Sequence, residues 1–176
     1  MLLNNQVLTL DTLHDTINCM RIPAIYLETI IFNFPFVDDA PQYRADTLKL
    51  FAEIKTGKFL PFTSEYVMQE LEAATDFVRD DRLRLIMEYG GEIIPASDKA
   101  KNLAAAYINA GLIPATYSTD GFHIAAATIK SLDFIVSLNF KHIVRRKTIE
   151  GAELINFHEG YKKIGIYSPA EVIDHD

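Results

Sequence analysis

The sequence has little that would support a disulfide-bonded or zinc-stabilised protein. Cys19 is the single cysteine among 176 residues, so no internal disulfide can form. The chain also has no CxxC motif and no cysteine–histidine spacing typical of a zinc site. With 49% hydrophobic and 23% charged residues, a chain of this length can bury a core without crosslinks. We therefore expect a reducing compartment and take the cytoplasm as its location.

The pattern also lacks a targeting segment, a membrane span and a linker. The first twenty residues have no basic n-region and carry Asp11 and Asp15 inside their apolar part, which argues against a secretory signal and against a membrane span. No repeat, low-complexity tract or Pro/Gly/Ser-rich stretch divides the chain. We expect a soluble protein with an N-terminal extension at residues 1–20 and one domain at residues 21–176.

Two classes of phosphate-binding protein are disfavoured by what is missing. No GxGxxG motif follows the first expected strand and no P-loop is present, which argues against a nucleotide-binding Rossmann protein. The formal net charge of −7 argues against a protein that coats nucleic acids, because such proteins need a broad basic surface. A nuclease with an acidic centre and a local basic rim remains compatible with this charge.

Short apolar runs alternate with helical patterns along the rest of the chain. Strands are expected at residues 23–28, 58–64, 92–95, 133–138 and 163–169. Helices are expected at residues 42–57, 65–80, 81–90, 97–111 and 119–130, with a short helix at 140–147. This alternation predicts an α/β protein of three layers, in which helices cover both faces of a central parallel sheet.

Two local features of these helices can be predicted as well. The helix at 42–57 should bury Leu48, Phe51 and Ile54 on its inner face. The following helix should begin with a side-chain cap from Thr63 or Ser64, since short hydroxyl side chains accept hydrogen bonds from free N–H groups at a helix start.

Four polar residues are expected to meet at one edge of the sheet. Glu28 ends the first strand and Asn139 ends the fourth, and in open parallel sheets the site lies beyond the carboxyl ends of the strands. Asp120 begins the helix that leads into the fourth strand, and Glu70 lies on the helix after the second. Asp133 opens the fourth strand, so we expect it at the opposite edge in a structural role.

Three carboxylates in one crevice indicate a bound cation. Like charges held close together repel and raise one another's pKa, so a divalent cation is needed to keep such a cluster ionised at neutral pH. Ligands that are all oxygen favour Mg²⁺ or Mn²⁺ over zinc. A cation held in this way polarises a phosphodiester and lowers the pKa of a bound water, and hydrolysis of a nucleic acid needs both effects.

Each of these residues also has an ordinary structural explanation. Asp120 could be favoured in a first helical turn by the helix dipole, and Glu28 could simply end a strand. Glu70 could be a solvated helix residue, and the pattern alone does not select it over the nearby Glu65 and Glu72. Asn139 could cap the short helix that follows it. His123, three residues after Asp120, could be a hydrogen-bonded core residue. The positions alone leave both interpretations open.

A basic run follows the fourth strand. It contains Lys141, Arg145, Arg146 and Lys147, on the same side of the chain as the expected acidic cluster. Such a run could be a solvated surface, or it could bind the phosphates of an RNA strand.

Five segments of the chain occur in a characteristic order and spacing. They are IYLETIIFNF, SEYVMQELEAA, LAAAYINAGLIPATYSTDGFHIAAAT, LDFIVSLNFKHIVRR and GYKKIGIYSPAEV. Together they resemble the PIN-domain family, especially bacterial members similar to VapC-type toxins of toxin–antitoxin pairs. The resemblance runs from about Ile22 to Ile173, and it is carried by the phrase DxxHIAAA followed by DFIVSxNFKHI.

The resemblance implies a small PIN-like α/β/α fold and an Mg²⁺- or Mn²⁺-dependent ribonuclease that cuts single-stranded RNA, leaving a 5′-phosphate and a 3′-hydroxyl. Glu28, Glu70 and Asp120 match the family's acidic, metal-holding positions, and Asn139 matches the fourth position of its site.

Further residues and partners are also implied by the resemblance. Thr29 and Ser137 match hydroxyl positions that help to arrange the site, and His123 matches a histidine in a supporting role. A homodimer and a small inhibitory antitoxin protein are the partners that the family suggests.

One departure from the family pattern supplies a competing hypothesis. The first acidic position is usually aspartate, in a phrase like YLDT, whereas this chain has YLET with Glu28. The extra methylene can shift the carboxylate, and a displacement of about 1 Å can cost roughly a hundredfold in rate. The alternative is therefore a catalytically weak or inactive PIN-like module that binds RNA or a partner protein. Stabilisation by Mn²⁺ separates the two hypotheses.

Overall fold

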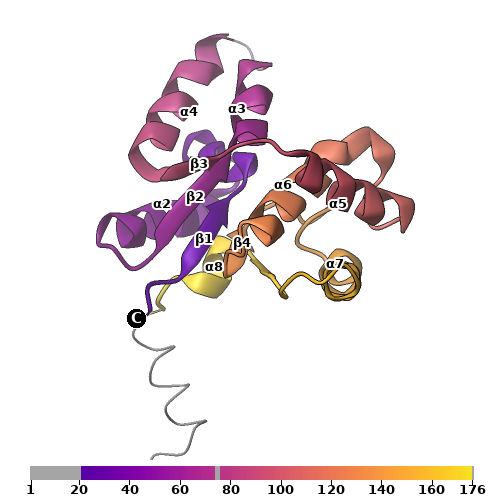
Figure 1. Cartoon of the computed structure of the whole chain (residues 1–176). Coiled ribbons are helices and arrows are strands. Elements are labelled where there is room, and N and C mark those ends of the chain that lie inside the picture. Colours follow the sequence, from indigo (N-terminus) through magenta and orange to yellow (C-terminus); the bar gives the residue numbers. More distant parts are fainter. Residues whose placement is uncertain (1–20, 74–75, 176) are drawn as a thin grey trace, which may run out of the picture.

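Five short strands form one all-parallel sheet at the centre of the molecule (Figure 1). The computed structural model describes residues 21–73 and 76–175. The expected N-terminal extension at residues 1–20 lies outside the described residues.

The order of the strands places a switch point at the middle of the sheet. The order is β3-β2-β1-β4-β5, so the chain proceeds in one direction from β1 and in the other from β4. Crevices at such a switch point, beyond the carboxyl ends of the strands, are the usual ligand sites of open α/β sheets. The strands are β1 (Ala24–Leu27), β2 (Leu60–Ser64), β3 (Glu92–Ile94), β4 (Phe134–Val136) and β5 (Gly165–Tyr167).

Helices cover both faces of this sheet. On one side α2 packs against α8, and on the other α5 packs against α6 and α7 (Figure 1). The predicted three-layer α/β/α architecture with a central parallel sheet is therefore confirmed. The helices are α2 (Pro41–Lys55), α3 (Glu65–Glu72), α4 (Asp76–Tyr89), α5 (Asp98–Asn109), α6 (Ser118–Ile129), α7 (Arg146–His158) and α8 (Pro169–Val172), with short 3₁₀ turns η1 (Thr29–Phe32), η2 (Phe34–Phe36) and η3 (Ala115–Tyr117).

The first strand is an unbroken run of apolar residues because both of its faces are buried. Every residue of β1 is buried, because helices cover the sheet on both faces. The small residues of α6 allow α5 to approach closely. A Cβ added at Gly121 would lie 3.5 Å from the Cβ of Ala104. The first turns of α6 are buried at Asp120, Gly121 and His123.

Two helix predictions are wrong: one boundary between neighbouring helices and one short helix. The segment expected as helices 65–80 and 81–90 divides earlier, since α3 ends at Glu72 and α4 begins at Asp76. The short helix expected at 140–147 is absent, because residues 140–145 form turns and bends.

One whole helix, α7, is not predicted by the sequence pattern. The interior glycine Gly151 lowers helix propensity, so the pattern there is weak. The structure gives that glycine a packing reason, because an added Cβ would lie 2.4 Å from Cδ2 of Leu112. Tertiary packing has thus selected a residue that disfavours the helix locally.

The inner face of α2 also differs from the expected one. Phe51 and Ile54 are buried as predicted, whereas Leu48 is 48% exposed, which makes that prediction wrong. The buried stripe is completed instead by Thr47 and Leu50. Leu48 lies about 100° around the helix from Thr47, so it points away from the core.

The predicted side-chain cap of α3 is not formed. Ser64 occupies the N-cap position without a capping hydrogen bond. Its hydroxyl lies 2.6 Å from the hydroxyl of Tyr26, and the hydroxyl of Thr63 donates to the carbonyl of Leu27. Both hydroxyl groups therefore serve buried contacts near the carboxyl end of β1.

Candidate functional site

The ends of β1 and β4 bring their polar residues together. Leu27 and Val136 are in register on these neighbouring strands, so Glu28 and Ser137 come next to each other at the switch point. The Ser137 hydroxyl donates to Oε2 of Glu28 at 2.9 Å. It also accepts the backbone N–H of Asn139 at 3.0 Å, which orders the chain directly after the strand.

Glu28 is the most deeply buried acid of the site. Its side chain is 6% exposed, and burial raises its pKa to about 7, against the opposing effects of the His123 charge and the Ser137 hydrogen bond. Removing a carboxylate from water disfavours the charged form. Glu28 therefore holds a proton more tightly than an ordinary glutamate unless a cation compensates its charge.

Glu70 projects from α3 toward the same place. Its Oε2 accepts a hydrogen bond from the hydroxyl of Thr29 and lies 3.1 Å from Nε2 of His123. Burial alone would raise the pKa of Glu70, but the hydrogen bond and charge of His123, together with Thr29, lower it. Glu70 is therefore held as a carboxylate beside Glu28.

His123 is fully buried and joins the two glutamates. Its Nε2 lies 4.0 Å from Oε1 of Glu28 as well as 3.1 Å from Glu70. Burial opposes protonation, but the hydrogen bond to Glu70 and the neighbouring carboxylates raise the pKa of His123. The imidazole can thus supply the positive charge that balances these acids.

A buried chain of hydroxyl groups orients His123, and the sequence pattern did not reveal it. The hydroxyl of Tyr26 lies 2.7 Å from Nδ1 of His123 and 2.6 Å from Oγ of Ser64. This contact fixes the ring so that Nε2 faces the glutamates, as a hydrogen bond to the other ring nitrogen does for metal-binding histidines. The available signal was a tyrosine inside an apolar strand, because a buried phenol needs a hydrogen-bond partner.

Asp120 faces the site from the first turn of α6. Its Oδ1 accepts a hydrogen bond from the Asn139 side-chain amide at 3.1 Å. Its Oδ2 is buried and has no hydrogen-bond partner among the described residues. Burial raises the pKa of Asp120, partly offset by His123 and His142. A buried carboxylate oxygen without a partner is unusual in a folded protein.

Asn139 contacts Asp120 and orders the turn that follows β4, whereas its role at a cation stays a prediction. Its amide contacts Asp120, and its Oδ1 accepts the backbone N–H of His142 at 3.0 Å. The second bond shapes the turn after β4, where a helix was expected.

Glu28, Glu70, Asp120 and Asn139 line one cavity of about 360 Å³, together with Thr29. One ligand atom each from Glu28, Glu70 and His123 lie within 4.8 Å of one another. Among the described residues this close group does not include Asp120, although Asp120 faces the same cavity. The buried unpaired oxygen of Asp120 and this group of ligand atoms together fit a divalent cation.

The basic run after β4 is largely engaged in local contacts. Arg145 donates to the carbonyl of Leu112, and Lys147 donates to the carbonyl of Gly111. Both side chains therefore contact the loop between α5 and α6. Arg146 forms an ion pair with Glu150 at 2.7 Å, and Lys141 lies 5.0 Å from the ring centroid of Tyr117. RNA binding by the run stays a prediction.

Asp133 lies at the opposite edge, as expected. Its Oδ2 accepts the backbone N–H of Ala24 at 2.7 Å and pairs with Arg21 at 3.3 Å. The carboxylate therefore links the amino end of β4 to the amino end of β1, which is a structural role.

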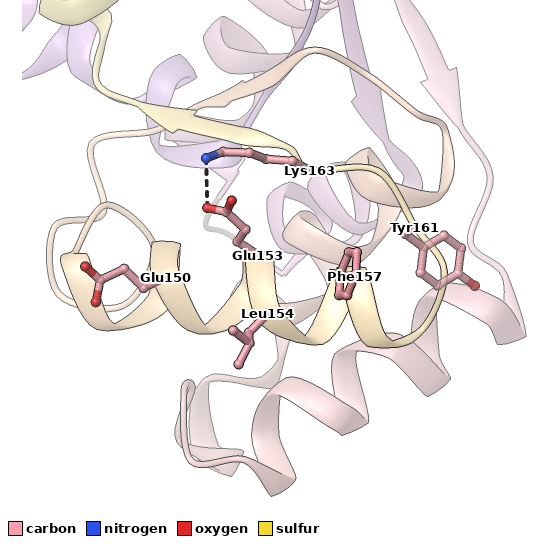
Figure 2. Close-up of a pocket in the computed structure, with 6 residues that line it drawn as sticks. All are labelled: Glu150, Glu153, Leu154, Phe157, Tyr161 and Lys163. Atoms are coloured by element: carbon pink, nitrogen blue, oxygen red, sulfur yellow. Dashed lines mark ion pairs between the residues drawn. The ribbon is translucent and has the colours of Figure 1, made fainter.

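A larger depression lies on α7, and its lining includes none of Glu28, Glu70 and Asp120. It has a volume of about 430 Å³ and contains the exposed side chains of Leu154 and Phe157. The Lys163 ammonium pairs with Glu153 at 2.8 Å along its wall (Figure 2). The two carboxylates in its lining, Glu150 and Glu153, already pair with Arg146 and Lys163.

Comparison with known proteins adds to the assignment of the fold. No family model matches the sequence, and no curated protein matches it. The structure is similar to the crystal structure of FitAcB from Neisseria gonorrhoeae, with a TM-score of 0.54 and 15% sequence identity over 84% of this chain and 99% of that chain. Within the described ranges, no helix is both long and apolar enough to cross a bilayer. At this identity the similarity concerns the fold alone, and the predicted PIN-like fold is confirmed.

Proposed function

We propose that the protein is a metal-dependent endoribonuclease that cleaves single-stranded RNA. The observation that supports this most strongly is the set of three acids that line one cavity at the switch point. Buried His123 lies next to two of them, and an oxygen of Asp120 is buried with no partner among the described residues. Such an arrangement is costly without a ligand, since buried charges need compensation.

Glu28, Glu70 and Asp120 would hold Mg²⁺ or Mn²⁺, directly or through water. The Nε2 atom of His123 lies close enough to both glutamates to take part, and a nitrogen ligand is better suited to Mn²⁺ than to Mg²⁺. A cation bound there polarises the phosphodiester and lowers the pKa of a bound water.

The surrounding residues keep these ligands in position. Ser137 donates to Glu28 and Thr29 to Glu70, which fixes one oxygen of each carboxylate and leaves the other available. The Asn139 amide holds Oδ1 of Asp120 in the same way. The hydrogen bond to Glu70 and the neighbouring carboxylates raise the pKa of His123, so a proton on this ring would offset part of their charge in the metal-free site.

Partners remain part of the proposal. Two helices that contact each other, α2 and α4, each carry an exposed apolar side chain. These are Leu48 on α2 and Met87 on α4, which is 87% exposed. We propose that a second copy of the chain or a small protein inhibitor binds at α2 and α4, where these two apolar side chains are exposed.

A second candidate is a weak or inactive PIN-like module that binds RNA or a protein. The burial of Glu28 and its pKa of about 7 favour it, because a carboxyl group that retains its proton is a poor ligand.

Cleavage of a mixed-sequence single-stranded RNA by purified protein separates the two candidates. The nuclease should cut in Mn²⁺, stop in EDTA and leave 5′-phosphate ends. An Asp120→Ala variant that melts as a folded protein should not cut. RNA that stays intact in Mn²⁺, while it still binds the protein, would favour the binding module.

A further inference from the structure

Arg82 brings a positive charge to the acidic cavity. It lies on α4 and lines the cavity together with Glu28, Glu70 and Asp120. Its side chain is half-buried, and its Nε is shielded from solvent with no hydrogen-bond partner among the described residues. Leaving a buried donor unpaired destabilises the folded protein, so this arrangement calls for an explanation.

The neighbouring carboxylates do not supply the missing partner. In the described part of the chain, none of the three site acids forms an ion pair with Arg82. Their hydrogen bonds go elsewhere, to Ser137, Thr29, His123 and Asn139. A guanidinium remains ionised at any physiological pH, so an uncommitted positive charge stands beside a cluster of acids.

A second unpaired polar group lines the same cavity. The Oδ1 atom of Asn33, which follows η1, is buried without a hydrogen-bond partner among the described residues. Two unsatisfied polar side chains from separate elements, α4 and the turn after η1, therefore border one space. Arg82 Nε is a donor, which suits a phosphate oxygen, whereas Asn33 Oδ1 is an acceptor and would need a donor of the same ligand, such as a ribose hydroxyl.

We propose that Arg82 binds a phosphate group of the single-stranded RNA and thereby positions the strand over the acid cluster. The inference rests on the proposed function and identifies the residue that makes it possible for an anion to approach three carboxylates. A guanidinium matches phosphate geometry because it can donate two parallel hydrogen bonds. Arg82 is a positioning residue, since it acts on the strand and not on the water or the cation.

RNA binding can be measured apart from cleavage. In the full chain carrying Asp120→Ala, the affinity for a short fluorescent single-stranded RNA is measured by anisotropy in Mn²⁺ at several KCl concentrations. Arg82→Gln should weaken binding about tenfold and lower the slope of log affinity against log salt by about one. Arg82→Lys should recover part of the affinity, because the charge returns without the planar fork.

Arg84 provides a matched control on the same helix. Its side chain is 80% exposed and pairs with Asp81 at 3.5 Å, and it does not line the cavity. Arg84→Gln removes the same charge and should change the affinity less than twofold, a size expected of an exposed group. Equal losses for Arg82→Gln and Arg84→Gln, or no RNA binding by any form, would overturn the inference. Melting curves confirm that each variant is folded.

The wild-type protein is assayed for cleavage in parallel, which separates this inference from the proposed function. Cutting by the wild type, together with RNA binding that Arg82→Gln leaves unchanged, would reject Arg82 and keep the nuclease. RNA binding that depends on Arg82 without any cutting would reject the nuclease and keep the phosphate site.

Discussion

The acids at the two edges of the sheet differ in whether their carboxylate oxygens have partners. At the amino edge, Asp133 has its acceptor oxygen paired with the N–H of Ala24 and with Arg21. At the carboxyl edge, Asp120 retains a buried oxygen with no partner among the described residues, and burial raises the pKa of both Asp120 and Glu28. The carboxylate of Asp133 is satisfied by groups of the fold, whereas His123 offsets only part of the burial of Glu28 and Asp120, and a bound cation would supply the rest.

The sharpest way to test this contrast is to remove one acid from each edge. Asp120→Ala should lower Mn²⁺-dependent RNA cleavage by roughly 10³-fold, since metal catalysis is worth several kcal/mol and each 1.36 kcal/mol is tenfold. Asp133→Ala should leave the cleavage rate of the folded protein within about threefold and destabilise it by about 1–3 kcal/mol, because the Ala24 N–H loses its partner. Initial rates and melting curves of both variants provide the comparison. A similar loss of cleavage in both would remove the distinction.

The buried carboxyl group of Glu28 should make the stability of the metal-free protein depend on pH. Its folded-state pKa of about 7 lies above the ordinary value of 4.5, so the folded protein binds this proton more tightly than the unfolded chain. Its contribution is full below pH 4.5 and is lost as the pH rises through 7, about 3 kcal/mol in all.

Glu28→Gln should remove this dependence. In EDTA at pH 8 we expect the variant to unfold at a higher temperature than the wild type, and at pH 5 we expect the two to differ little. Mn²⁺ should stabilise the wild type more than the variant. A variant that is less stable than the wild type at pH 8 in EDTA would contradict the assigned burial cost.

The hydroxyl of Tyr26 tests the orientation of His123. Tyr26→Phe should lower Mn²⁺ affinity about 10–100-fold, the usual effect of losing a hydrogen-bond partner that orients a metal ligand. Tyr107→Phe is the matched control, because its buried hydroxyl donates to Asn156 away from the cavity. It should lose stability but retain Mn²⁺ affinity. The shift of melting temperature with Mn²⁺ concentration measures both, and equal affinities for the two variants would exclude the orienting role of Tyr26.

The basic run should give the smallest effect. Lys141 contacts the exposed aromatic ring and the hydroxyl of Tyr117, so Lys141→Ala should weaken RNA binding by less than tenfold and lower the salt slope by about one. Arg146→Ala, which also breaks an exposed pair with Glu150, should lower the affinity less. Binding that is insensitive to both substitutions would place the RNA path elsewhere.

Much of the contrast between the edges follows from chain order. Parallel strands bring their carboxyl ends to one edge, so the sequence alone is enough to place Glu28 and Asn139 together and Asp133 opposite them. Asp120 joins them because it begins the helix that leads into β4. These placements need only the direction of each strand, which the apolar runs define well.

Side-chain networks between distant elements cannot be predicted in this way. The contact of Tyr26 with His123 depends on the rotation of α6 against β1, and the presence of Arg82 at the cavity depends on where α3 ends and α4 begins. The sequence pattern places the end of the first of these helices at residue 80, whereas α3 ends at Glu72, so the pattern gives Arg82 no role. The weak helical signal around Gly151 conceals α7 for a related reason, since its packing partner Leu112 lies far away in the sequence.

Direct measurement of Mn²⁺ binding tests the central claim that the carboxyl-edge acids await a cation. Electron paramagnetic resonance reports free Mn²⁺ during titration of the purified protein at pH 8. We expect one ion bound per chain in the wild type and in Asp133→Ala, with binding strongly reduced in Glu70→Gln. A wild-type protein that leaves all Mn²⁺ free at millimolar concentration, or a Glu70→Gln variant that binds as well as the wild type, would contradict the account.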